Sequence, residues 1–150
     1  MARAWVFQRP EQVATMVQDD EIERIAVDCV IALLRADGWE VVSVEAENRG
    51  FDLIAKKCNA ADPLASIQVR FIEVKGRAGV GEVALTTNEY KTAERLGDDY
   101  WLYVVYNCAA KPDVHRIQNP ARLAWEPIVR VEHYHIGATA ILKQEEARPC

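Results

Sequence analysis

The stretch GFDLIAKKCNAADPLASIQVRFIEVK, residues 50–75, decides the fold of this chain. Two apolar-rich runs, at 51–57 and 67–75, are separated by the segment CNAADPLAS at 58–66. The asparagine, aspartate and proline of that segment are typical of a turn. The stretch therefore predicts a β-hairpin with a long loop.

Folding of this hairpin brings two acidic side chains together. Residues that pair in a hairpin lie equally far from its turn, and Asp52 and Glu73 are equally far from the Asp62-Pro63 centre. Because strand side chains alternate between faces, Lys75 shares a face with Glu73. Adjacent carboxylates repel each other unless a positive charge lies between them, and a hard divalent cation with oxygen ligands is the usual partner. The residues therefore suggest a metal site at one end of the hairpin.

The composition is that of an ordinary soluble globular protein. The chain has 150 residues, of which 50% are hydrophobic and 27% are charged, enough for one domain with a sizeable core. The longest apolar runs are too short to span a bilayer, and the first residues lack the apolar region of a signal peptide. The four cysteines are scattered without a CxxC pair, which predicts reduced thiols and a cytoplasmic location.

The net charge of −5 disfavours a protein whose whole surface binds nucleic acid. It allows a local basic groove, since lysines and arginines gather in the middle of the chain between 56 and 95. Charges spread over the surface for solubility explain the same composition equally well.

Patterns along the chain predict alternating helices and strands. Apolar residues from Ile22 to Leu34 repeat with helical spacing, and Thr86 with Glu89 forms a capping-box signature at the start of a second helix. The other predicted elements are strands at 39–44, 51–57, 67–75, 99–107, 113–118 and 129–136, a short apolar piece at 83–85 and a short helix at 120–125. The order of helix, three strands, helix and strand predicts an α/β fold with a mixed sheet.

This pattern divides the chain into three parts. We expect an N-terminal extension at 1–19 and a central domain at 20–125. Residues 126–150 are expected to form a C-terminal strand and tail packed on the same domain.

An aspartate at the start of one strand and Glu-x-Lys at the end of the next, in αβββαβ order, resemble the PD-(D/E)XK nuclease superfamily. The chain is most similar to one branch, the domain family of the C-terminus of the plant protein NO VEIN. The resemblance covers roughly residues 20–121, and the superfamily's proline before the aspartate is replaced by Phe51. The motifs that carry it are Glu23-Arg-Ile-Ala, Gly50-Phe51-Asp52, Ile72-Glu73-Val74-Lys75-Gly76, Thr86-Thr87-Asn88-Glu89-Tyr90 and the run from Trp101 to Tyr106.

The resemblance implies a restriction-endonuclease-like core, a mixed central sheet flanked by helices, that hydrolyses phosphodiester bonds in DNA with a metal ion. Asp52 and Glu73 would hold Mg²⁺ or Mn²⁺, with the backbone carbonyl of Val74 as a third protein ligand. Lys75 would orient or help deprotonate the attacking water and offset charge in the transition state.

Glu23 has two interpretations that do not exclude each other. The resemblance places this helix glutamate at the edge of the active site, where it would bind the metal through water. Asp20 and Glu23 also form a capping box, which needs no function.

Three further residues, Arg77, Asn88 and Lys91, are predicted to bind nucleic acid. Arg77 lies in the loop after the hairpin, and Lys91 follows a strand-to-helix turn from which it would reach a phosphate. For either cation alone, a solvated surface charge is the plainer interpretation.

Two functional classes follow from these observations. The first is the nuclease module of a larger nucleic-acid-processing or defence system, with a helicase-like or ATPase partner because this chain has no P-loop. The alternative is a non-catalytic nucleic-acid- or protein-binding module that retains the nuclease fold, in which Asp52, Glu73 and Lys75 form an ion-pair cluster at the sheet end. DNA or RNA as partner, and a homodimer or a monomer, are left open by the sequence, and no membrane partner is expected.

Overall fold

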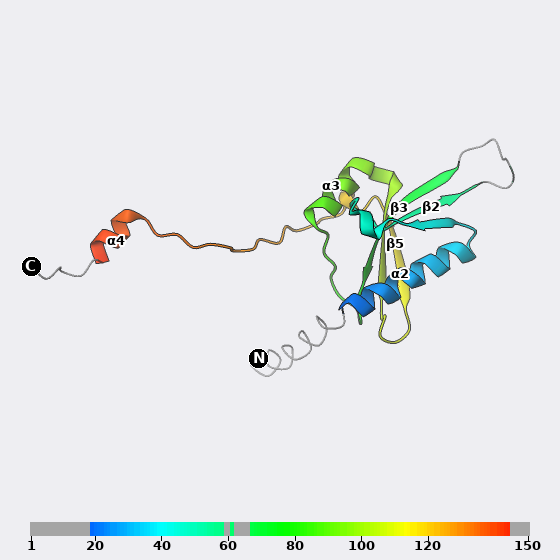
Figure 1. The fold of residues 1–150 in the computed structure, drawn as a ribbon, viewed down its shortest axis with the longest axis horizontal. Coiled ribbons are helices and arrows are strands. Elements are labelled where there is room, and N and C mark those ends of the chain that lie inside the picture. Colours follow the sequence, from blue (N-terminus) through cyan, green and yellow to red (C-terminus); the bar gives the residue numbers. More distant parts are fainter. Residues whose placement is uncertain (1–18, 59–60, 62–66, 145–150) are drawn as a thin grey trace, which may run out of the picture.

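The chain forms a mixed sheet with helices packed on both of its faces. The computed structural model describes residues 19–58, 61 and 67–144. The predicted order of helix, three strands, helix and strand is confirmed. The elements in chain order are α2 (Asp19–Ala36), β1 (Glu40–Ser43), η1 (Glu45–Glu47), β2 (Leu53–Lys57), β3 (Gln68–Gly76), α3 (Thr87–Leu96), η2 (Gly97–Asp99), β4 (Tyr100–Tyr106), β5 (Asp113–Gln118), η3 (Pro120–Arg122) and α4 (Ala138–Gln144) (Figure 1).

The sheet has five strands in the order β1-β2-β3-β4-β5. Strands β3 and β4 are parallel, whereas the other three neighbouring pairs are antiparallel. Helix α3 makes the crossover between the two parallel strands, as a parallel connection requires. The fold is therefore α/β with a mixed sheet, and it is consistent with the expected restriction-endonuclease-like architecture.

The hairpin of β2 and β3 has the register that its sequence predicts. Leu53 faces Ile72 and Lys57 faces Gln68 in an antiparallel ladder. Continuing this register outward by one pair places Asp52 opposite Glu73. The tip of the hairpin, at 59–60 and 62–66, lies outside the described residues.

Helix α2 covers one face of the sheet. Ile22, Ala26, Val30 and Leu34 are buried and lie four residues apart, so they follow one side of the helix. They form one core cluster with buried residues of the strands, among them Leu53, Ile72, Val74, Tyr103 and Val105.

Gly76, the last residue of β3, lies where the helix and the sheet come closest. A Cβ at this position would lie 2.7 Å from the Cβ of Ala26 and 3.1 Å from the carbonyl oxygen of Ile22. Only a residue without a side chain therefore lets the end of β3 pack against α2.

Helix α3 lies on the opposite face. A second core cluster contains Val44, Phe51, Ala93 and Tyr100. The hydroxyl of Tyr100 is buried and donates a hydrogen bond to the carbonyl oxygen of Gly50, at 2.8 Å. Gly50 itself has a φ of +88°, and a Cβ there would collide with the side chain of Thr92 in α3. This glycine lets the chain turn tightly beneath α3, immediately before Asp52.

The C-terminal part of the chain differs from the prediction. The strand expected at 129–136 does not form, and residues 126–137 run without helix or strand away from the sheet (Figure 1). The alternating pattern there is strand-like, but a strand needs a neighbour to pair with, and the sheet's ladders do not include these residues. The expectation that 126–150 packs on the same domain is therefore wrong for residues 126–137.

Smaller differences concern two short segments. Residues 83–85 form no strand, and the short helix expected at 120–125 is the single 3-10 turn η3. Residues 1–18 of the extension expected at 1–19 lie outside the described residues, as do residues 145–150, whereas Asp19 is the first residue of α2. No helix in the described ranges is both long and apolar enough to cross a membrane.

Candidate active site

Asp52 lies at the mouth of the hairpin, just before β2. Its backbone N–H donates to the carbonyl oxygen of Ile72, at 2.8 Å, which keeps the chain against β3. Its carboxylate oxygen Oδ2 accepts a hydrogen bond from the backbone N–H of Val74, at 2.9 Å. Burial raises the pKa of the Asp52 carboxyl, although this hydrogen bond works in the opposite direction. The aspartate is thus held against the strand that carries Glu73 and Lys75.

Glu73 is the most deeply buried charged side chain of the cluster, with only 3% of its surface exposed. Burial raises the pKa of its carboxyl to about 10, and a hydrogen bond with Glu89 and the charge of Asp52 act in the same direction. In this environment the protonated form of the Glu73 carboxyl is favoured well above the pH at which a glutamate in water ionises.

Lys75 connects Glu73 with a second glutamate. Its Nζ lies 3.2 Å from Oε1 of Glu73, and 3.0 Å and 3.3 Å from the two carboxylate oxygens of Glu89. Burial disfavours the charged form of Lys75, but the nearby acids outweigh it, so the pKa of Lys75 is raised. The lysine is therefore a charged donor fixed between two acidic side chains.

Glu89, in the first turn of α3, is the site residue that sequence reasoning missed. The predicted capping box is confirmed: the N–H of Thr86 donates to Glu89 Oε1 at 2.8 Å, and the N–H of Glu89 donates to Thr86 Oγ1 at 3.2 Å. Burial favours its neutral form, yet hydrogen bonds from Glu73, Thr86 and Lys75 lower the pKa of the Glu89 carboxyl. The ionised form of Glu89 is therefore favoured, and it accepts a hydrogen bond from the Glu73 carboxyl.

A signal for Glu89 was present in the sequence. A helix that connects two parallel strands begins near the carboxyl end of the first strand. The first turn of α3 therefore lies near the end of β3, where Lys75 is located. The capping box explains why the position is a glutamate, but it does not exclude a place in the site.

Glu23 approaches the cluster from α2. Its Oε1 accepts a hydrogen bond from the backbone N–H of Gly76, at 3.3 Å. Burial raises the pKa of the Glu23 carboxyl, and its charge interacts with those of Lys75, Asp52 and Glu89. The structure therefore places Glu23 at the edge of the cluster, with its carboxylate directed to the end of β3.

The three residues predicted to bind nucleic acid are all exposed. The guanidinium of Arg77 donates to the carbonyl oxygen of Glu82, at 2.7 Å, and packs against Gly81. Arg77 thus closes the loop after β3. Asn88 and Lys91 are exposed on α3, the helix whose first turn contains Glu89.

The oxygen donors at the hairpin end suit a hard divalent cation. Asp52 and Glu73 offer carboxylates, the ligand type that Mg²⁺ and Mn²⁺ prefer. The N–H of Val74 points toward Asp52. In a strand the carbonyl of a residue points to the same side as its N–H. The Val74 carbonyl therefore also points to the β2 side of β3, beyond the end of β2. In the part of the chain that the structure describes, no three or more His, Cys, Asp or Glu side chains form a group that could hold a metal. The candidate set is therefore two carboxylates and one backbone carbonyl.

Comparison with known proteins gives one match. No curated protein and no solved structure matches the chain. The family model described as "Protein NO VEIN, C-terminal" matches residues 22–117, a range that contains Glu23, Asp52, Glu73, Lys75 and Glu89. This match covers more than half of the chain and runs from α2 to β5. The chain therefore belongs to the family of the C-terminal domain of Protein NO VEIN.

Proposed function

We propose that this domain is a metal-dependent nuclease of the PD-(D/E)XK type that hydrolyses phosphodiester bonds in DNA. The observation that carries the proposal is the convergence of Asp52, Glu73 and Lys75 at one end of the hairpin. Glu23 from α2 and Glu89 from α3 reach the same place. Burying Glu73 among other acids around one lysine is costly to fold, and perturbed groups of this kind gather at functional sites.

The roles follow from the positions of the side chains. Asp52, Glu73 and the Val74 carbonyl would hold Mg²⁺ or Mn²⁺, which supplies charge stabilisation and an activated water when bound. Lys75 donates hydrogen bonds toward the same place, where it would orient the attacking water and offset negative charge on the phosphate. Glu89 fixes the Lys75 ammonium by accepting two of its hydrogen bonds.

One observation favours the non-catalytic alternative. Lys75 already lies within ion-pair distance of Glu73 and Glu89, so the cluster satisfies itself without a ligand. In a binding module that retains the fold, this arrangement would stabilise the sheet end and the start of α3. Nucleic acid or protein would then bind elsewhere, with a helicase-like or ATPase partner supplying any chemistry.

The two proposals differ in a cleavage assay. The purified chain is incubated with supercoiled plasmid and with linear single-stranded DNA, with and without Mn²⁺. A nuclease cuts only with metal, and Asp52→Asn and Lys75→Ala each lower turnover about a hundredfold or more. Lys111→Ala, an exposed lysine of the β4–β5 turn, is the matched control and leaves turnover unchanged. DNA binding without cleavage under every metal would support the binding module instead.

A further inference from the structure

The apolar side chains that the domain exposes are concentrated after the sheet. We call residues 126–137 the C-terminal arm. Its large apolar residues are between 63% and 92% exposed, namely Ile128, Val129, Val131, Tyr134 and Ile136. Each Å² of apolar surface left in water costs roughly 25 cal/mol relative to burial. Exposed apolar side chains gathered in one segment are typical of a surface that contacts another molecule.

The arm has the sequence of a strand. Val129 and Val131 alternate with Arg130 and Glu132, and the run contains no glycine or proline from 128 to 136. Its backbone N–H and C=O groups lack ladder partners in the described sheet. To form a strand, the arm therefore needs to pair with the edge of a sheet.

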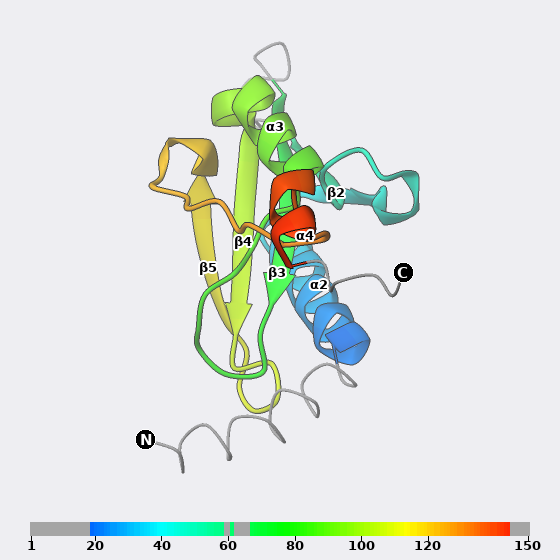
Figure 2. The same cartoon turned by 90° about the vertical axis from the view of Figure 1, so that its left-hand side faces the viewer.

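Strand β5 offers such an edge (Figure 2). The N–H of Asn119 donates to the carbonyl oxygen of Tyr100, at 2.9 Å, which fixes the alternation of hydrogen-bonded pairs between β4 and β5. By this alternation, the N–H and C=O groups of Val114, Arg116 and Gln118 point away from β4, toward the free side of the sheet. An unpaired row of this kind is a template for strand addition.

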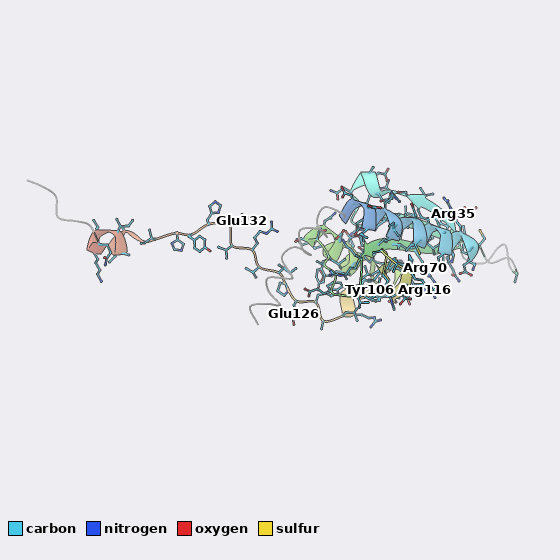
Figure 3. The ribbon with its side chains drawn as sticks, turned by 90° about the horizontal axis from the view of Figure 1, so that it is seen from below. Arg35, Arg70, Tyr106, Arg116, Glu126 and Glu132 are labelled. Carbon is cyan, nitrogen blue, oxygen red and sulfur yellow. The ribbon has the colours of Figure 1, made fainter. Side chains whose placement is uncertain are left out.

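The arm does not lead back to its own β5. The indole N–H of Trp125 donates to the carbonyl oxygen of Pro120, at 2.7 Å, and the backbone N–H of Trp125 donates to Leu123, at 3.0 Å. Pro120 is buried, so these bonds anchor the start of the arm to the domain. From this anchor the arm runs outward, and Glu132 lies far from Arg116 of the same chain (Figure 3).

We infer that the arm of one copy adds as an antiparallel strand to β5 of a second copy, with Glu132 opposite Arg116. In this register Val131 faces Ile117 and His135 faces Asp113, so an apolar pair and a pair of complementary polar groups accompany the ion pair. Among the described residues, neither Glu132 nor Arg116 has an ion-pair partner within 4.0 Å in its own chain.

The opposite edge of the sheet fits the arm less well. Strand β1 has four residues, against six in β5. Glu40, Glu45 and Glu47 lie in or just after β1, and they would repel Glu132. Charge and length therefore both favour β5. The inference does not depend on the proposed nuclease activity.

The test is the molar mass of the full chain measured by light scattering over a range of protein concentrations. We expect a dimer that dissociates on dilution. A reciprocal dimer contains the Glu132–Arg116 pair twice, so Glu132→Arg or Arg116→Glu alone should weaken dimerisation about tenfold or more. The double variant, Glu132→Arg with Arg116→Glu, should recover most of the affinity. Glu126→Arg, which makes the same charge change before the apolar run, is the matched control.

Hydrogen exchange locates the contact independently. The amides of Arg116 and of alternate arm residues, Arg130, Glu132 and Tyr134, should be protected in the dimer and should exchange freely on dilution. A monomer at every concentration would overturn the inference, and protection of these amides in such a monomer would show pairing within one chain. A dimer that both single variants leave unchanged would overturn the assignment to β5.

Discussion

The Lys75 ammonium donates to both carboxylate oxygens of Glu89, at 3.0 Å and 3.3 Å. This contact joins β3 to α3, fourteen positions later in the chain. The same carboxylate accepts the N–H of Thr86 and so begins the helix. One side chain therefore caps α3 and fixes the orientation of the only lysine that the described residues bring to the acidic cluster.

Replacing Glu89 by glutamine should separate these two roles. Glutamine can still complete the capping box, so the free energy of unfolding should change by less than about 1 kcal/mol. Its neutral amide no longer fixes the ammonium by charge, so DNA cleavage should fall about tenfold to a hundredfold. Turnover and urea unfolding are measured on the same preparations, with Glu94→Gln on the exposed side of α3 as the control. Unchanged turnover would assign Glu89 to capping alone.

The metal-free protein should lose stability as the pH rises. Burial raises the pKa of Glu73 in the folded state from 4.5 to about 10, so folding favours the protonated carboxyl. The stability that protonation of Glu73 contributes is therefore fully present below pH 4.5 and is lost progressively as the pH rises toward 10. Glutamine cannot ionise, so Glu73→Gln should be more stable than wild type by about 1 kcal/mol or more near pH 8, and the difference should shrink near pH 5. Urea unfolding of wild type and Glu73→Gln in the presence of a chelator measures the stability difference near pH 5 and near pH 8. A difference of the same size at both pH values would contradict the raised pKa of Glu73.

Gly76→Ala should destabilise the fold. The added Cβ would lie 2.7 Å from the Cβ of Ala26, inside a packed contact between β3 and α2. Such overpacking typically costs about 1–3 kcal/mol. Gly79→Ala is the control, since a Cβ there meets nothing within 4 Å. Equal unfolding midpoints for the two variants would show that α2 can move away from the strand.

Tyr100→Phe tests the buried hydrogen bond between Tyr100 and the Gly50 carbonyl, two residues before Asp52. The change removes the hydroxyl that donates to the Gly50 carbonyl in a buried position. A buried acceptor that loses its donor costs about 1–3 kcal/mol. Thermal unfolding should show this loss, whereas Tyr134→Phe on the exposed arm should leave the midpoint in place.

The register of the hairpin was predictable from the sequence, and the wider geometry was not. Pairing in a hairpin is symmetric about its turn, so Asp52 and Glu73 could be placed opposite each other by counting residues. Glu89 depends on how α3 packs over β3, which no local pattern specifies. The strand expected at 129–136 was wrong for a related reason. Alternation shows which residues can share a face, but it does not show that an edge lies within reach.

The parallel pairing of β3 with β4 has a consequence for how the site is assembled. Every acid of the cluster, and Lys75, precedes β4 in the chain, yet Glu73 lies directly beside Leu102 of that strand. Until Tyr100–Tyr106 has been synthesised and has paired with β3, Glu73 lacks the strand that lies beside it in the folded domain. Parallel pairing is non-local and slow to form, because the intervening loop must close first. The cluster is thus a late product of folding, and a ribosome-bound chain that ends before β4 carries all of its residues without the site.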